Sequence, residues 1–295
     1  MIGIEERDTQ SGIHVFRIHY TADPAKRSVE WQDEAARGMV GGRTGKAWRR
    51  EMEIDWTVAS GLPVYAEEYV RDIHVAKQPI EYDPSLVVYR GWDFGNTPAC
   101  VWAQMDSLSR LLFIRELVTW DGRGPQRSSN IEAMMPLVTA ISSAEFPGAH
   151  FIDYADPAGW SRSQTDGKSC VDIMTAYLSA TQGYADIRPG PMSWSARNNA
   201  MTRALTRMVS GAAALQISPT CSMLVEGFEG AYKFKEKGQS GLYTGDPEKN
   251  AWSHPMDGAH YVVGALFTPH SDDPVDDAPH YEYYERSPNR SGAYY

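Results

Sequence analysis

The sequence lacks several features that would place it in a specialised class of protein. It has only three cysteines in 295 residues, far apart and without a Cys-x-x-Cys pair, which argues against a disulfide framework or a zinc knuckle and fits a reducing compartment. No apolar run approaches the roughly 18 residues that a membrane-spanning helix needs. The N-terminus has neither the basic start nor the apolar block of a signal peptide. We therefore expect a cytoplasmic protein without a membrane partner.

Positive charge is also scarce, because the chain carries a net charge of −10 at pH 7. Proteins that bind nucleic acid without specificity are usually basic, so this balance alone argues against that class. The acidic residues are unevenly placed, however, and six of them fall at positions 272, 273, 276, 277, 282 and 285. Because this stretch is also rich in Pro, Ser and Tyr, we predict that residues 270–295 form an acidic disordered tail.

A functional phosphate-binding P-loop is missing, although residues 41–47 superficially resemble one (Gly-Gly-Arg-Thr-Gly-Lys-Ala). A P-loop needs a glycine five positions before its Gly-Lys pair and a Ser or Thr directly after it. Here those positions hold Val40 and Ala47, and no strand is predicted before the glycines. We expect a flexible basic loop and no ATPase site in this chain.

The most informative stretch is residues 85–95 (Ser-Leu-Val-Val-Tyr-Arg-Gly-Trp-Asp-Phe-Gly), an apolar run that predicts a strand delivering Asp93. Residues 99–104 and 111–118 predict two further strands, joined by a turn at 106–110. An acid in an apolar sheet is costly to bury unless it is paired or binds a cation. A strand, an acid and a three-stranded meander is how an RNase H-like nuclease core begins, although an Asp at this position can also simply cap a loop.

The rest of the chain alternates between helical and strand patterns. Strands are predicted at 12–20, 150–155 and 215–217. Helices are predicted at 28–37, 169–180, 195–210, 221–234 and 253–267, the last of these capped by Ser253. A further helix should run from a cap at Ser128 or Ser129 to residue 146, with Pro136 as a kink or a late start. Three lysines at 233, 235 and 237 precede a predicted hairpin tip at 238–241. A sheet with helices on both sides indicates an α/β layered domain.

Three aspartates stand out as candidates for chemistry: Asp93 in the sheet, Asp156 at a strand exit and Asp257 in the first turn of a helix. Hydrolysis of a phosphodiester calls for charge neutralisation and an activated water, which two divalent cations roughly 3.5–4 Å apart supply when hard oxygen ligands hold them. His254 lies three residues before Asp257, so the two share one helix face. It could orient the acid, contact phosphate or join in metal ligation.

Three motifs together resemble the nuclease domain of tailed-phage terminase large subunits. They are residues 92–95 (Trp-Asp-Phe-Gly), 153–159 (Asp-Tyr-Ala-Asp-Pro-Ala-Gly) and 254–261 (His-Pro-Met-Asp-Gly-Ala-His-Tyr). The resemblance implies an RNase H-like (integrase/resolvase-type) fold, with a mixed central sheet and flanking helices. It further implies catalysis by Asp93, Asp156, Asp257 and His254, with the three aspartates holding two Mg²⁺ or Mn²⁺ ions. The family often has Ala after its last Asp, where this chain has Gly258.

This resemblance also implies a biological role, namely metal-dependent cleavage of double-stranded viral DNA concatemers during genome packaging in the host cytoplasm. The implied partners are double-stranded DNA, a terminase small subunit, a portal protein and a separate ATPase chain. Residues 1–80 resemble the end of the family's ATPase domain and its linker, but neither a Walker A motif nor a strand ending in Asp-Glu is present. We therefore divide the chain into residues 1–80 (ATPase-domain remnant and linker), 81–269 (RNase H-like nuclease) and 270–295 (tail).

Several alternatives stay open at this point. Asp153 is either a fourth acid or a capping residue, Glu116 is either a ligand or structural, and His260 is either part of a metal cluster or structural. Basic residues at 197, 203, 207, 233, 235 and 237 either contact DNA phosphates or belong to solvated surfaces. The chain as a whole could instead be a non-catalytic assembly module of a packaging complex, or another RNase H-like enzyme such as a junction resolvase.

Overall fold

The computed structural model describes residues 2–8, 14–37, 42–44, 46–54, 61–122, 129–164, 167–237 and 243–267. The predicted tail at 270–295 and the predicted hairpin tip at 238–241 lie outside the described residues. Within the described ranges, no helix is long and apolar enough to cross a membrane.

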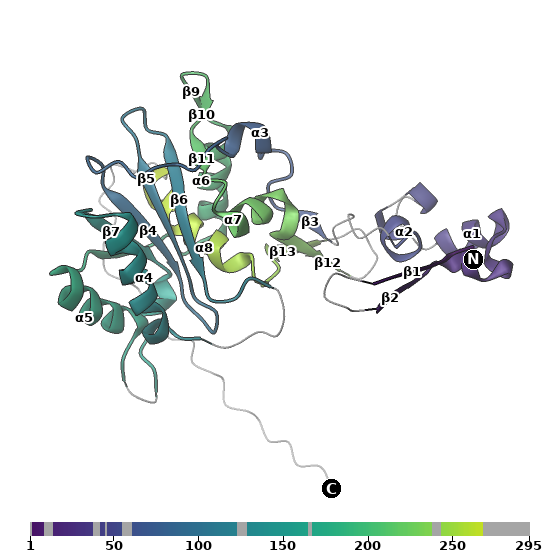
Figure 1. Cartoon of the computed structure of the whole chain (residues 1–295), viewed down its shortest axis with the longest axis horizontal. Helices are drawn as coiled ribbons and strands as arrows, with labels where there is room; N and C mark the ends of the chain where they lie inside the picture. The colour runs from purple at the N-terminus through teal and green to yellow at the C-terminus, as the bar shows by residue number, and fades with distance from the viewer. Residues whose placement is uncertain are drawn as a thin grey trace, which may run out of the picture.

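A six-stranded mixed sheet in the order β11-β6-β5-β4-β7-β8 forms the centre of the molecule (Figure 1). Its strands are β4 (Val88–Asp93), β5 (Ala99–Met105), β6 (Leu111–Val118), β7 (Phe151–Ala155), β8 (Ile187–Pro189) and β11 (Leu215–Ile217). β4, β5 and β6 form the predicted antiparallel meander, β7 and β8 continue it in parallel from β4, and β11 adds in parallel to β6. The α/β class and the mixed central sheet with flanking helices predicted from the sequence are confirmed.

The meander closes where the sequence predicts a turn. The Asp106 side chain accepts hydrogen bonds from the backbone N–H groups of Leu108 and Arg110, 2.9 Å each, and its other oxygen accepts one from the Arg110 guanidinium. An aspartate that bonds to the backbone two residues later is a standard way of making a tight turn. This turn therefore fixes how β5 pairs with β6.

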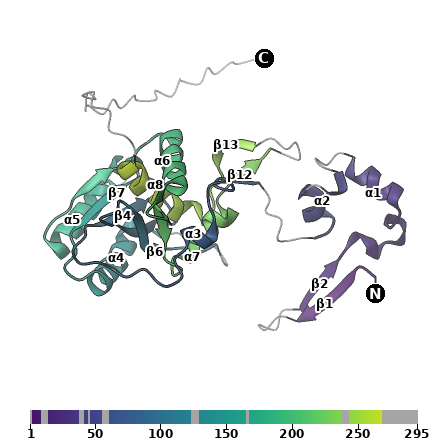
Figure 2. The same cartoon turned by 90° about the horizontal axis from the view of Figure 1, so that it is seen from above.

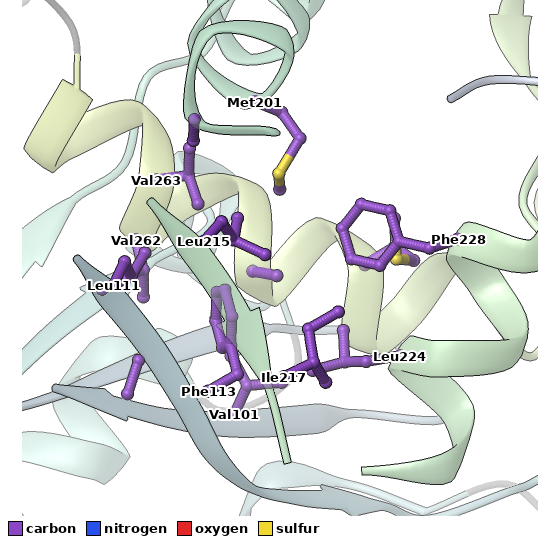
Figure 3. Close-up of a cluster of buried hydrophobic side chains, with 14 of the residues drawn as sticks. Val101, Leu111, Phe113, Met201, Leu215, Ile217, Leu224, Phe228, Val262 and Val263 are labelled. Atoms are coloured by element: carbon purple, nitrogen blue, oxygen red, sulfur yellow. The ribbon is translucent and has the colours of Figure 1, made fainter. Parts of the chain in front are cut away.

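Helices cover both faces of the sheet. On one face Trp92 and Trp102 pack with α4 (Ile131–Glu145) and α5 (Cys170–Gln182). On the other face Val101 and Phe113 pack with α6 (Trp194–Thr206), α7 (Ser222–Glu226) and α8 (Ser253–Phe267). Figure 3 shows this second layer, with Val101, Phe113 and Leu215 of the sheet beside Val262 and Val263. Each fully buried Phe or Val stabilises the fold by roughly 1.5–3 kcal/mol.

Two helix starts differ from the sequence prediction. Asn130, rather than Ser128 or Ser129, caps α4 by accepting from the Ala133 N–H over 2.9 Å, and Pro136 is accommodated inside that helix without a late start. Ser253 is the first residue of α8, and the Asn250 side chain accepts from its N–H over 3.1 Å. α5 begins as predicted, since Ser169 forms a capping box with Asp172.

The predicted continuous helix at 221–234 is wrong. α7 is followed by one wider helical turn, Gly227–Ala231, in which Gly230 takes a φ of 125°. This positive φ is not helical, so the helix ends at Gly230. Glycine can adopt it because it has no Cβ, whereas other residues rarely do. The chain then enters β12 (Lys233–Glu236), which pairs antiparallel with β13 (Tyr243–Pro247) and with β3 (Leu62–Pro63).

The predicted helix at 195–210 ends early. α6 stops at Thr206, and Met208–Val209 forms the short strand β9, which pairs with β10 (Ala212–Ala213). The strand at 215–217 lies where it was predicted, as β11.

The described residues between positions 2 and 54 form a separate small arrangement that both views place apart from the central sheet (Figures 1 and 2). It contains the hairpin β1 (Ile4–Asp8) and β2 (His14–Ile18), followed by α1 (Val29–Ala36) and α2 (Lys46–Glu51). The glycine-rich stretch that was predicted as a flexible loop includes a short 3-10 helix, Gly42–Thr44, and the start of α2.

Residues 61–76, in contrast, contact the sheet domain. α3 (Arg71–His74) ends with a buried His74 whose ring lies 2.9 Å from the Leu205 carbonyl oxygen, and the Ala76 N–H donates to the Ile217 carbonyl. Tyr65 belongs to the apolar layer beneath α8. The domain boundaries predicted from the sequence remain predictions, and these contacts show which part of the first eighty residues supports the sheet.

Candidate functional site

Asp93 and Asp156 lie at the carboxyl ends of two neighbouring parallel strands. The register pairs Trp92 of β4 with Ala155 of β7, and the Asp156 N–H donates to the Trp92 carbonyl over 3.1 Å. Trp92 and Ala155 both pack in the layer of α4 and α5. Because successive side chains of a strand point to opposite faces, Asp93 at the end of β4 is directed toward the face covered by α8. Asp156 follows directly after β7.

The turn after β7 is tightly packed and leaves no room for a side chain at Gly159. Asp156 caps the short 3-10 helix Pro157–Trp160 by accepting from the Ala158 N–H over 2.9 Å. Gly159 lies against the Phe94 ring so closely that a Cβ there would come within 2.1 Å of a ring carbon. The turn is thereby packed against the residue that follows Asp93, which holds the two strand ends together.

α8 brings Asp257 to the same place because two glycines allow it to approach β4. A Cβ on Gly91 would come within 2.0 Å of the Gly258 carbonyl oxygen, and one on Gly258 within 3.0 Å of the Gly91 carbonyl oxygen. Asp257, directly before Gly258, is consequently only 3% exposed, and Asp93, two residues after Gly91, is 4% exposed. Helix and strand meet by their backbones, and two carboxylates are buried at the contact.

His254 contacts the first of these acids. Its Nδ1 lies 2.7 Å from Asp93 Oδ2, and its Nε2 lies 2.7 Å from the hydroxyl of Thr97, which is buried in the loop after β4. With both ring nitrogens engaged, the imidazole orients the Asp93 carboxylate. The sequence analysis missed Thr97, because no spacing rule links a loop threonine to a histidine 157 residues later in the chain.

Asp257 is surrounded by cationic and phenolic groups. Lys249 Nζ lies 2.5 Å from Oδ2, while Arg197 Nη1 lies 3.5 Å and the Tyr232 hydroxyl 3.4 Å from Oδ1. Arg197 was predicted only as a possible phosphate contact, and Lys249 and Tyr232 were not predicted at all. The three residues come from α6, from the segment before α8 and from the segment before β12, so only the tertiary fold reveals the cluster.

His260 lies one helical turn after Asp257 on α8 and is close to its carboxylate. The ring is fully buried, its Nε2 lies 2.6 Å from the Tyr65 hydroxyl, and its Nδ1 lies 3.7 Å from Asp257 Oδ1. This placement between a tyrosine and an acid matches the structural alternative for His260. It also connects residue 65, outside the predicted nuclease boundary, to the candidate site.

Burial and charge act differently on the two buried acids. Burial raises the pKa of Asp93 to about 6, and the charge of Asp257 adds to the rise, although the hydrogen bond from His254 opposes it. Burial also raises the pKa of Asp257, but His260 and Lys249 outweigh this and hold it well below its usual range. Asp257 is therefore a charged partner of Lys249, whereas Asp93 is a carboxyl whose ionisation a nearby cation would favour.

Tyr261 links all three aspartates electrostatically. Burial raises the pKa of its hydroxyl, and the charges of Asp156, Asp257 and Asp93 raise it further. The three acids that the sequence analysis selected therefore lie within electrostatic range of one phenol on α8.

The donor set fits a divalent cation in part. Asp93 and Asp156 present hard carboxylate oxygens at adjacent strand ends, the ligand type that Mg²⁺ and Mn²⁺ prefer. The Asp257 carboxylate is instead occupied by Lys249 and Arg197. Within the described ranges, no three His, Cys, Asp or Glu side chains are arranged to hold a metal ion. The geometry thus offers two carboxylates at adjacent strand ends, and not a closed cage.

Two acids that the sequence left open have structural partners. Asp153 is fully buried and accepts from Arg90 Nε and Nη2 over 2.7 and 2.8 Å and from Trp92 Nε1 over 2.6 Å. Glu116 accepts from the backbone N–H groups of Met223 and Leu224 over 2.7 and 2.9 Å, so it caps the start of α7.

A cavity of about 280 Å³ opens beside Asp257. Its lining includes Trp194, Arg197, Tyr232, Pro247 and Lys249. Two carboxylates, Asp246 and Asp257, line it as well, so aromatic faces, two cations and two anions meet in this cavity. The cavity therefore extends the candidate site toward the hairpin of β12 and β13.

Comparison with solved structures identifies the fold. The large terminase of the thermophilic bacteriophage D6E superposes with a TM-score of 0.53 at 14% identity, covering 85% of this chain and 55% of that one. This chain shares the fold of a large terminase. It spans about half the length of that terminase. No protein-family model matches the sequence, and no curated protein matches it.

Two nuclease-domain structures also match, at lower TM-scores. The P22 large terminase nuclease domain matches with a TM-score of 0.46 and 13% identity, covering 69% of this chain and 92% of that domain. The large terminase nuclease of the thermophilic phage G20c with bound cobalt matches with a TM-score of 0.43 and 12% identity, covering 70% of this chain and 97% of that one.

Proposed function

We propose that this chain is a divalent-cation-dependent endonuclease of the large-terminase type that cuts double-stranded DNA. The observation that carries the proposal is the placement of Asp93 and Asp156 at adjacent strand ends, with Asp93 in contact with His254 of the helix that carries Asp257. The fold that this chain shares with a large terminase supports the proposal. The roles of Asp93, Asp156, Asp257 and His254 are part of this proposal.

The chemistry required is hydrolysis of a phosphodiester by water. A Mg²⁺ or Mn²⁺ ion supplies charge neutralisation and an activated water when bound. Asp93 and Asp156 would hold the ion, and His254 keeps the Asp93 carboxylate oriented through its contacts on both ring nitrogens. Lys249 and Arg197, beside Asp257 in the cavity, are placed to donate to the charged oxygens of a phosphate.

The biological setting we propose is genome packaging, in which the enzyme cuts viral DNA concatemers. The proposed partners are a terminase small subunit, a portal protein and a separate ATPase chain. In the stretch where a P-loop was considered, Gly42–Thr44 forms a short 3-10 helix and Lys46–Glu51 forms α2. An ATP-binding measurement on this chain would test the prediction that it has no ATPase site, and we expect no binding.

Cleavage of plasmid and linear duplex with Mg²⁺ or Mn²⁺, against EDTA, tests the proposed activity. We expect metal-dependent cuts that Asp156→Asn lowers by at least about a hundredfold. Asp186→Asn is the matched control, because Asp186 forms an exposed ion pair with Arg188 away from the site. Preferential cleavage of four-way junctions would favour a resolvase instead. Absence of cleavage with any metal, together with retained binding to a packaging partner, would favour an assembly module.

A further inference from the structure

We propose that the Lys249 ammonium, together with the Arg197 guanidinium, supplies at Asp257 the positive charge that a second divalent cation would otherwise supply. The centre then binds a single divalent ion, held by Asp93 and Asp156. This inference rests on the proposed nuclease function, and it departs from the two ions predicted from the sequence.

The contacts of Asp257 carry the first step. Both of its oxygens are engaged, Oδ2 by Lys249 Nζ at 2.5 Å and Oδ1 by Arg197 Nη1 at 3.5 Å and by the Tyr232 hydroxyl at 3.4 Å. The carboxylate is 3% exposed, so it cannot turn to solvent to find other ligands. A cation that used Asp257 would have to displace Lys249. The side chains that already neutralise this acid engage the oxygens that a metal ion would need.

The charge balance carries the second step. The Asp257 carboxylate faces two cationic side chains, Lys249 and Arg197, and the exposed Asp246 lines the same cavity. Positive charge beside Asp257 is therefore supplied by the chain itself. A divalent cation placed between Asp257 and these two side chains would be repelled by both of them.

The location of Lys249 gives it access to the substrate as well as to Asp257. It lies between β13 and α8, its side chain is 73% exposed, and it lines the cavity next to Trp194 and Tyr232. An ammonium has three donors. One serves Asp257, and the others are available to a phosphate oxygen of a strand lying in the cavity.

Counting bound Mn²⁺ per full-length chain tests the inference without DNA and without measuring activity. In equilibrium dialysis, electron paramagnetic resonance measures the concentration of free Mn²⁺, and the difference from the total gives the number of ions bound per chain. We expect one ion for the wild type and two for Lys249→Met, because the variant frees one side of Asp257. Lys235→Met is the matched control, since Lys235 is exposed on β12 of the same hairpin, and it should bind one ion. Thermal unfolding of each variant verifies that it is folded.

The possible outcomes separate this inference from the proposed function. Two ions in the wild type, or one ion in folded Lys249→Met, overturns the role given to Lys249 and leaves the nuclease proposal intact. No bound ion in the wild type overturns both. A kinetic readout follows the same logic: the cleavage rate at limiting Mn²⁺ should rise with the first power of its concentration in the wild type and more steeply in Lys249→Met.

Discussion

Gly91 and Gly258 touch through their backbones, with the Gly258 carbonyl oxygen 2.0 Å from where a Cβ on Gly91 would lie. This contact sets the distance between β4 and α8, and therefore between Asp93 and Asp257. It also accounts for the glycine after Asp257, because an alanine Cβ at position 258 would come within 3.0 Å of the Gly91 carbonyl oxygen. The site depends on two residues that carry no functional group.

Replacing Gly91 should therefore be severe. In Gly91→Ala the added methyl meets backbone atoms that cannot move away without shifting α8, and we expect the free energy of unfolding to fall by about 3 kcal/mol. Chemical denaturation measures this. Gly245→Ala is the control, because a Cβ there meets nothing within 4 Å. If Gly91→Ala were as stable as the wild type, the close approach of strand and helix would be refuted.

The pair Arg90 and Asp153 should matter for stability and not for metal binding. Both side chains are fully buried, so Asp153→Asn leaves an uncompensated guanidinium inside the sheet domain, and we expect a loss of about 3–5 kcal/mol in the free energy of unfolding. The same change at Asp186, in an exposed pair with Arg188, should cost at most about 1 kcal/mol. A stable but inactive Asp153→Asn protein would show instead that Asp153 is a fourth catalytic acid.

Glu116 should make stability depend on pH. Burial raises its pKa from the ordinary value of 4.5 to about 7, and the two hydrogen bonds from α7 oppose this only in part. Because the pKa is raised on folding, the stabilisation by the protonated carboxyl is fully present below pH 4.5 and is lost as the pH rises through 7.

Glutamine does not titrate, so Glu116→Gln should become more stable relative to the wild type as the pH rises from about 5 to 8. The relative gain should be on the order of 3 kcal/mol. Urea denaturation at several pH values measures it. Glu145→Gln, which removes an exposed carboxylate paired with Arg115, should keep the wild-type profile. A parallel pH dependence for Glu116→Gln and the wild type would contradict this account.

The sheet and its acids were accessible to sequence reasoning because their signals are local. The apolar run at 85–95 ends in Asp93 at the end of β4, and the capping pair Ser169 and Asp172 begins α5. Helix starts were harder to predict where several polar residues could serve as the N-cap. At Ser128, Ser129 and Asn130, any of the three side chains could accept a hydrogen bond from a backbone N–H of the first turn, and Asn130 does so. The helix predicted at 221–234 ends early because Gly230 takes a positive φ, and the amino-acid composition of this stretch does not indicate that angle.

The environment of the acids could not be predicted in the same way. Lys249 reaches Asp257 only because β13 ends next to the start of α8, and Thr97 reaches His254 only because the loop after β4 folds over that helix. Such pairs depend on tertiary approach, and no period or motif in the chain records them. The proposed one-ion centre rests on these contacts, whereas the two-ion prediction came from the family resemblance and from the chemistry of phosphodiester hydrolysis.

The rate of duplex cleavage by Asp93→Asn at saturating Mn²⁺ tests the central claim most directly. Asn keeps the size of the side chain and removes the charge, so circular dichroism and thermal unfolding should match the wild type. We predict a loss in rate of at least about a thousandfold, while Asp186→Asn cleaves at the wild-type rate. Wild-type cleavage by folded Asp93→Asn would contradict the assignment of this site as the nuclease centre.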